Sequence, residues 1–215
     1  MRWLSGLVIL ALCLEGCESP SQERLRDYSQ DGIYLFQRGE YLAARESFEA
    51  ALTLKPDDPG LLYNVAECCD RVGDAAKAER YYHQCLAQAP NQVACRHALD
   101  ALLLRSGRKD EAAHQVEAWL AREPRLAAAY AEDGWLWHQT GDLPRARARL
   151  EQALELDPHE PHALVELALV YEAMQRPDRA VVLYERILER DPRQVEVANR
   201  LNRLRSQGAR QPQPE

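Results

Sequence analysis

The sequence lacks the short motifs that most often mark a catalytic or cofactor site. It contains no HExxH zinc motif, no glycine-rich loop that could cradle a phosphate, and no nucleophile motif. Its six cysteines include no CxxC pair. We therefore predict that the protein is not an enzyme, that it has no small-molecule substrate, and that it holds no cofactor and no metal ion.

Positive charge is also scarce. The chain has 27 Lys and Arg against 34 Asp and Glu, which gives a formal net charge of −7. An acidic surface repels a phosphate backbone, so nucleic acid is not an expected partner. Hydrophobic residues make up 46% of the chain and charged residues 28%. These proportions are typical of a globular domain and not of a disordered chain.

The apolar stretch at the start of the chain is short. Residues Trp3 to Leu14 follow the positive Arg2 and are interrupted only by Ser5 and Gly6. A helix that spans a bilayer needs about 20 apolar residues, whereas this length suits the hydrophobic region of a signal peptide. We therefore exclude this segment from the folded domain.

The stretch ends in Leu14-Glu15-Gly16-Cys17, which resembles the lipobox of bacterial lipoproteins. The resemblance implies that residues 1–16 are a lipoprotein signal peptide and that Cys17 carries the lipid. Glu15 departs from the pattern, and Cys13 is a weaker candidate because the residue before it is not small. The alternatives are an ordinary secretory peptide or an uncleaved short anchor. A lipid on Cys17 would attach the protein to the cell envelope, facing the periplasm, and we expect the outer membrane in preference to the inner membrane.

Three columns of residues recur every 34 positions in the rest of the chain. An alanine column comprises Ala44, Ala78, Ala112, Ala146 and Ala180; a leucine column Leu52, Leu86, Leu120, Leu154 and Leu188; and a proline column Pro56, Pro90, Pro124, Pro158 and Pro192. Glycine recurs with the same period at Gly39, Gly73, Gly107 and Gly141. A period of this length indicates a repeat protein in which neighbouring units share one core.

The period and these residue types resemble the tetratricopeptide-repeat (TPR) family. The resemblance implies an all-α, right-handed superhelical solenoid of five helical hairpins, with glycine at each hairpin turn and proline at the end of each unit. The predicted repeats are 25–58, 59–92, 93–126, 127–160 and 161–194. They follow a short tether at 17–24 and precede a capping helix at 195–205 and a disordered tail at 206–215.

Two repeats depart from the pattern. In the third, Arg96 and Asp100 replace an apolar and a small residue, and we interpret them mainly as a structural ion pair in a wider hairpin filled by Trp119. A functional pair is the alternative. The fifth repeat lacks the turn glycine and has Gln175-Arg176-Pro177 instead.

Cysteine and histidine placement leaves little scope for a special site. Cys69 and Cys85 fall in core columns and are expected to be buried thiols, although a disulfide between Cys85 and Cys95 is an alternative. The run from His159 to His162 superficially resembles a metal cluster. We interpret it as a turn with incidental polar residues, because no complete ligand set is evident.

In the TPR family the first helices of the hairpins line a concave groove. The residues of this chain that we expect to form the peptide-binding groove are Phe36, Tyr63, Glu67, His97, Trp135 and His138. The expected anchors among them are Phe36, Tyr63, Trp135 and His138, since aromatic residues dominate binding hot spots. Trp135 suits the core equally well. The Lys and Asn that clamp a C-terminal carboxylate in chaperone adaptors are absent, so an extended or helical apolar peptide is the expected ligand.

We therefore predict a membrane-anchored scaffold or assembly factor of the bacterial cell envelope that binds a protein or peptide partner. Small TPR lipoproteins of the envelope are the group that the chain most resembles. The alternatives are a periplasmic chaperone-like factor for the maturation of exported proteins, and a non-catalytic subunit of an envelope enzyme complex.

Overall fold

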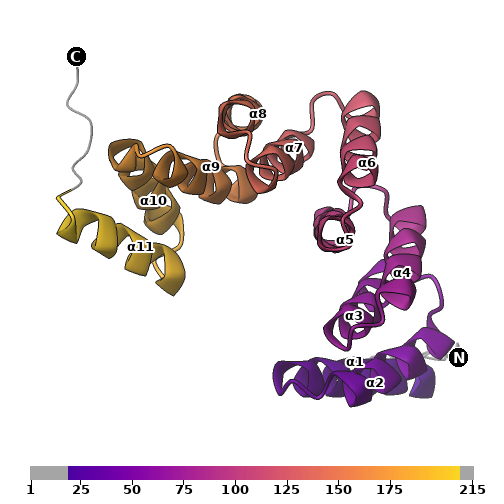
Figure 1. The fold of residues 1–215 in the computed structure, drawn as a ribbon. Coiled ribbons are helices and arrows are strands. Elements are labelled where there is room, and N and C mark those ends of the chain that lie inside the picture. Colours follow the sequence, from indigo (N-terminus) through magenta and orange to yellow (C-terminus); the bar gives the residue numbers. More distant parts are fainter. Residues whose placement is uncertain (1–18, 209–215) are drawn as a thin grey trace, which may run out of the picture. The chain divides into compact units, whose positions relative to one another are not determined.

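The structure, a computed structural model, describes residues 19–208, which form helices and no strand. The helices are α1 (Pro20–Gln37), α2 (Tyr41–Leu54), α3 (Pro59–Arg71), α4 (Ala75–Gln88), α5 (Val93–Arg105), α6 (Lys109–Arg122), α7 (Ala127–Gln139), α8 (Leu143–Leu156), α9 (Pro161–Ala173), α10 (Pro177–Arg190) and α11 (Val195–Ser206) (Figure 1). The predicted all-α fold is confirmed. The predicted signal peptide, Cys17 and most of the tail lie outside the described residues.

The chain divides into two compact units. The N-terminal unit extends to Pro90 and contains α1 to α4, whereas the C-terminal unit begins at Asn91 and contains α5 to α11. In the N-terminal unit α1 packs on α2, α3 on α4, and α2 on α3. In the C-terminal unit consecutive helices from α5 to α8 form two hairpins, α9 pairs with α10, and α7 also contacts α9. Each hairpin thus buries its apolar face against its neighbour.

The hairpin turns explain the glycine column. Gly39, Gly73, Gly107 and Gly141 all have φ between 75° and 86°, a left-handed conformation that costs glycine little. The equivalent residue of the fifth repeat is Gln175, and it has the same left-handed backbone at φ 59°. The turn geometry is therefore kept in all five hairpins, and only the residue changes.

The first helix begins earlier than the predicted first repeat. Ser19 caps α1 by accepting a hydrogen bond from the backbone of Gln22, whose side chain in turn accepts from the backbone of Ser19. Pro20 occupies the first turn, where its missing N–H is not needed. Residues 20–24, predicted as part of a tether, are consequently helical.

Close packing within hairpins explains the small residues of the first helices. A Cβ added to Gly32 would lie 2.6 Å from the Phe48 ring, and one added to Gly134 would lie 2.5 Å from Leu150. The small residue therefore lets the large apolar residue of the second helix sit directly on the first. The alanine column behind it is fully buried.

The last helix closes the C-terminal unit. Val197, Leu201 and Leu204 of α11 are buried in the core that α9 and α10 contribute to. On the polar side, Arg200 and Arg203 form ion pairs with Glu172 of α9, and Arg205 pairs with Glu185 of α10. α11 thus covers the apolar end of the repeat array.

Among residues 19–208, none of the helices combines the length and the apolar character that crossing a membrane would require.

Candidate functional site

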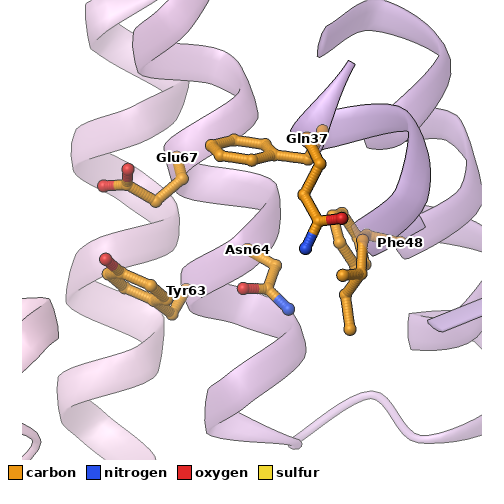
Figure 2. Close-up of a pocket in the computed structure, with 7 residues that line it drawn as sticks. Gln37, Phe48, Tyr63, Asn64 and Glu67 are labelled. Atoms are coloured by element: carbon orange, nitrogen blue, oxygen red, sulfur yellow. The ribbon is translucent and has the colours of Figure 1, made fainter. Parts of the chain in front are cut away.

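Three of the predicted groove residues meet in one pocket of the N-terminal unit. Phe36 of α1 and Tyr63 and Glu67 of α3 line a pocket of about 230 Å³ (Figure 2). The rest of the lining comprises Ile33, Gln37, Phe48 and Asn64. The pocket therefore lies between two successive first helices, with the second-helix residue Phe48 as part of its wall.

The carboxylate of this pocket is held in place. The Tyr82 hydroxyl of α4 donates a 2.6 Å hydrogen bond to Oε1 of Glu67. Burial and this hydrogen bond both raise the pKa of Tyr82, so the hydroxyl stays protonated and keeps donating. Phe36 is half-buried, and its ring packs edge-to-face with that of Tyr41, with the ring centroids 5.2 Å apart. A fixed carboxylate thus borders an apolar hollow that is large enough for one side chain of a ligand.

The other three predicted groove residues belong to the C-terminal unit. His97 of α5 lies edge-on to Trp135 of α7, with ring centroids 4.4 Å apart. Trp135 is 7% exposed, so most of its surface is already covered by the protein itself. His138 is half-buried, and its Nδ1 lies 3.0 Å from Oε2 of Glu166 in α9.

Sequence reasoning missed the residues that join these side chains. Glu132 of α7 is fully buried, and its carboxylate oxygens lie 3.1 and 3.2 Å from Nδ1 of His97. Oε2 of Glu132 is also 3.7 Å from Nδ1 of His162 in α9. The Nε2 atom of that imidazole is 4.0 Å from Oε1 of Glu166. A chain of three imidazoles and two carboxylates therefore crosses α5, α7 and α9.

A signal for part of this cluster was present in the sequence. Glu132 and Glu166 occupy equivalent positions in successive repeats. This position comes one residue after the repeat position that Tyr63 and His97 share, which was assigned to the groove. His162 was interpreted only as part of a turn. In the structure the neighbouring Glu160 performs the turn function by capping α9 through the backbone of Ala163, whereas His162 faces Glu132.

The irregular third repeat contains a buried polar group beside this cluster. Arg96 lies over the ring of Trp119, 4.4 Å from its centroid, and Nε1 of Trp119 donates to the side chain of Asn91. Burial and, secondarily, the charge of Glu132 raise the pKa of Asp100 to about 8, although Arg96 opposes the shift. Arg96 and Asp100, which replace an apolar and a small residue, are thus both buried in the fold.

The cysteines form no disulfide in the part of the chain that the structure describes. Cys68, Cys69, Cys85 and Cys95 are buried thiols. Burial raises the pKa of Cys68 to about 12 and also raises that of Cys69, which keeps both sulfurs protonated and unreactive.

Comparison with protein families gives a consistent result over most of the chain. One tetratricopeptide-repeat family model matches residues 31–93 and 102–148, which is more than half of the chain. Another tetratricopeptide-repeat model matches residues 138–204.

The curated relatives are much longer proteins. Cellulose synthase operon protein C of Pseudomonas fluorescens is 29% identical over 164 residues, which cover 73% of this chain and 13% of the relative. Outer dynein arm-docking complex subunit 4 of Danio rerio is 51% identical over 51 residues, or 24% of this chain and 10% of the relative. The chain thus spans only about a tenth of the length of these relatives.

Solved structures match over nearly their whole length. A thermophilic TPR protein of Thermus thermophilus is 27% identical with a TM-score of 0.66, covering 86% of this chain and 98% of that protein. Pseudomonas aeruginosa pilF is 17% identical with a TM-score of 0.55, covering 88% of this chain and 92% of that protein. The second similarity concerns the fold alone.

Proposed function

The chain belongs to the tetratricopeptide-repeat family, and we propose that it is a membrane-anchored scaffold that binds an apolar segment of a partner protein in the pocket between α1 and α3. TPR domains bind protein or peptide partners and are in general non-catalytic. The pocket is the observation that carries the proposal, because three residues that the sequence predicts for the binding groove, Phe36, Tyr63 and Glu67, line it together.

The chemistry of the pocket suits one apolar side chain flanked by peptide backbone. Phe36 and Tyr63 supply aromatic surface, which contributes strongly to binding when it is covered. The side chains of Gln37 and Asn64 offer amide donors and acceptors for a main chain that passes beside them. Glu67 disfavours a ligand carboxylate at the same place. A segment with a large apolar residue and no nearby acidic group is the ligand that fits.

An envelope location is the second part of the proposal. It depends on the lipobox-like sequence before Cys17, and the bacterial relatives named for a cellulose synthase operon fit such a context. A lipid on Cys17 would hold the repeats close to a membrane, since Ser19 already caps the first helix.

Site-specific photocrosslinking in intact cells tests the pocket. Ile33 lines the pocket and is exposed, so a photoreactive residue at this position should crosslink to a specific partner protein. Combining it with Phe36→Ala and Tyr63→Ala should reduce the crosslinked product at least about tenfold, as expected for loss of two aromatic anchors.

The matched control carries the photoreactive residue at Leu42, which is exposed on α2 and does not line the pocket. It should not yield the same product. Circular dichroism verifies that the double variant stays helical. If the product persists in the folded double variant, or if Leu42 gives the same product, the pocket is not the binding site.

A further inference from the structure

His97 of α5, Glu132 of α7 and His162 of α9 form a cluster of potential metal ligands. The Nδ1 atoms of His97 and His162 both face the carboxylate of Glu132. One nitrogen or oxygen from each of these three residues lies within 4.8 Å of the others. All three residues belong to the C-terminal unit.

The burial of Glu132 favours a positive group close to its carboxylate. Glu132 is fully buried, and an ionised carboxylate is costly to bury unless a positive group faces it. Two imidazoles are its facing groups here, and a neutral imidazole nitrogen is the commonest metal ligand in proteins. The imidazoles remain accessible, because the side chain of His97 is 40% exposed and that of His162 is 23% exposed. An ion could therefore reach the carboxylate from solvent.

We propose that His97, Glu132 and His162 bind a divalent transition-metal ion of the zinc class. Two nitrogens and one carboxylate oxygen are a donor set that zinc accepts, whereas magnesium and calcium require oxygen donors. Donor atoms around a tetrahedral zinc ion are about 3.4 Å apart at Zn–N distances of about 2.0–2.1 Å. The imidazoles therefore need to approach by at most about 1.5 Å, which rotation of their side chains provides. Water completes the coordination.

The surroundings of His162 fit the role of a ligand. If its Nδ1 binds the metal, its Nε2 carries the proton and faces Oε1 of Glu166, at 4.0 Å in the structure. A carboxylate behind a coordinating imidazole fixes the tautomer and the orientation of the ring. Glu166 is itself oriented by His138, whose Nδ1 lies 3.0 Å from its Oε2. Trp135 supports His97 in turn by packing against its ring.

The experiment is a direct metal titration of the untagged, full-length chain after treatment with a chelator. Titration with Zn²⁺, followed by calorimetry and by equilibrium dialysis, should give saturable binding of one ion per chain. Titration with Co²⁺ should give the visible absorption bands of a four- or five-coordinate site. An excess of Mg²⁺ or Ca²⁺ should not displace either ion.

Variants assign the site. His97→Asn and His162→Asn keep a hydrogen-bond donor for Glu132 but remove a metal ligand, and each should weaken Zn²⁺ binding more than about 100-fold. Glu166→Gln, which alters only the outer partner of His162, should weaken it about 10- to 100-fold. The controls are His83→Asn on α4 and His114→Asn on α6, which remove exposed histidines outside the cluster and should leave the affinity unchanged.

Three results would overturn the proposal. The first is the absence of saturable Zn²⁺ binding to the folded wild-type chain. The second is unchanged affinity in His97→Asn and His162→Asn, which would place the ion elsewhere. The third is an equal loss in the control variants, which would indicate non-specific binding to histidines. Because the wild-type titration needs no substitution, it decides the question even if a variant fails to fold.

Discussion

Gln175 adopts the backbone conformation that glycine has at the four equivalent turns. Its φ is 59°. The backbone N–H of Arg176 donates a hydrogen bond to the carbonyl of Tyr171, as the N–H of Asp142 does to the carbonyl of Trp137 in the preceding repeat. For a residue with a Cβ, this left-handed conformation costs about 1–2 kcal/mol. The fifth hairpin thus keeps its turn at a local cost.

We therefore expect Gln175→Gly to raise the free energy of unfolding by about 1 kcal/mol, after allowance for the greater freedom of glycine in the unfolded chain. Urea unfolding followed by circular dichroism measures the change. The reverse substitution Gly141→Gln, at the same position of the preceding repeat, should lower the stability by a similar amount. A stabilising Gly141→Gln or a destabilising Gln175→Gly would contradict this account of the turn.

Two buried tyrosines predict how stability depends on alkaline pH. Burial, and then hydrogen bonds to Glu67 and Glu172, raise the pKa values of Tyr82 and Tyr184 in the folded protein. In the unfolded chain a tyrosine titrates near pH 10. Above that pH the unfolded chain loses protons that the folded chain retains, so the stabilising contribution is present below about pH 10 and is lost as the pH rises further.

The stability of the wild type should fall by up to about 2.7 kcal/mol per pH unit above pH 10 from these two groups. The variant Tyr82→Phe/Tyr184→Phe should show a shallower fall, but should start from a lower stability at pH 7 because each lost hydrogen bond to a carboxylate costs about 1.5 kcal/mol. Urea unfolding between pH 7 and 11 tests both expectations. The exposed Tyr28, changed to Phe, is the control. Equal alkaline slopes in the wild type and the double variant would refute the assignment.

At the scale of elements, each helix depends on its neighbours for most of its stability. A hairpin cannot bury its apolar face alone, so the final hairpin needs α11. Leu201 is 4% exposed within the shared core, whereas Val195 at the start of the same helix is 69% exposed. The two residues are therefore a matched pair for testing how strongly α11 is held.

Leu201→Ala should lower the free energy of unfolding by about 2–4 kcal/mol, because it removes buried methyl groups and leaves a cavity. Val195→Ala should change it by less than about 0.5 kcal/mol. Thermal unfolding measures the overall effect, and amide hydrogen exchange shows whether α11 opens first. Comparable effects of the two substitutions would mean that α11 does not cap the core.

At the scale of the whole molecule, membrane attachment would determine which partners the repeats can reach. Cys17 lies outside the described residues, so this prediction comes from the lipobox resemblance alone. Cys17→Ala should move most of the protein from the membrane to the soluble periplasmic fraction and abolish labelling by a fatty-acid precursor. Cys13→Ala is the control and should change neither. Retained membrane association of Cys17→Ala would exclude the lipid anchor.

The repeat columns are enough to identify the family and the helical fold. The alanine, glycine and proline columns suffice because each hairpin repeats one packing arrangement, with a small residue under a large one and a left-handed turn after the first helix. These contacts join residues of the same hairpin, so they produce the same residue pattern every 34 positions and can be recognised in the sequence. The same reasoning proposed Phe36, Tyr63 and Glu67, which the structure places around one pocket.

Which polar side chains meet depends on the tertiary structure. His97, Glu132 and His162 are separated by 35 and 30 positions, which are not multiples of the 34-residue period. They converge because their side chains extend from α5, α7 and α9 toward a common point. Periodicity identifies which helices are neighbours but not where their side chains end. The contacts of Glu132, which join the cluster, follow from packing in three dimensions, whereas the repeat pattern records only that Glu132 and Glu166 occupy equivalent positions.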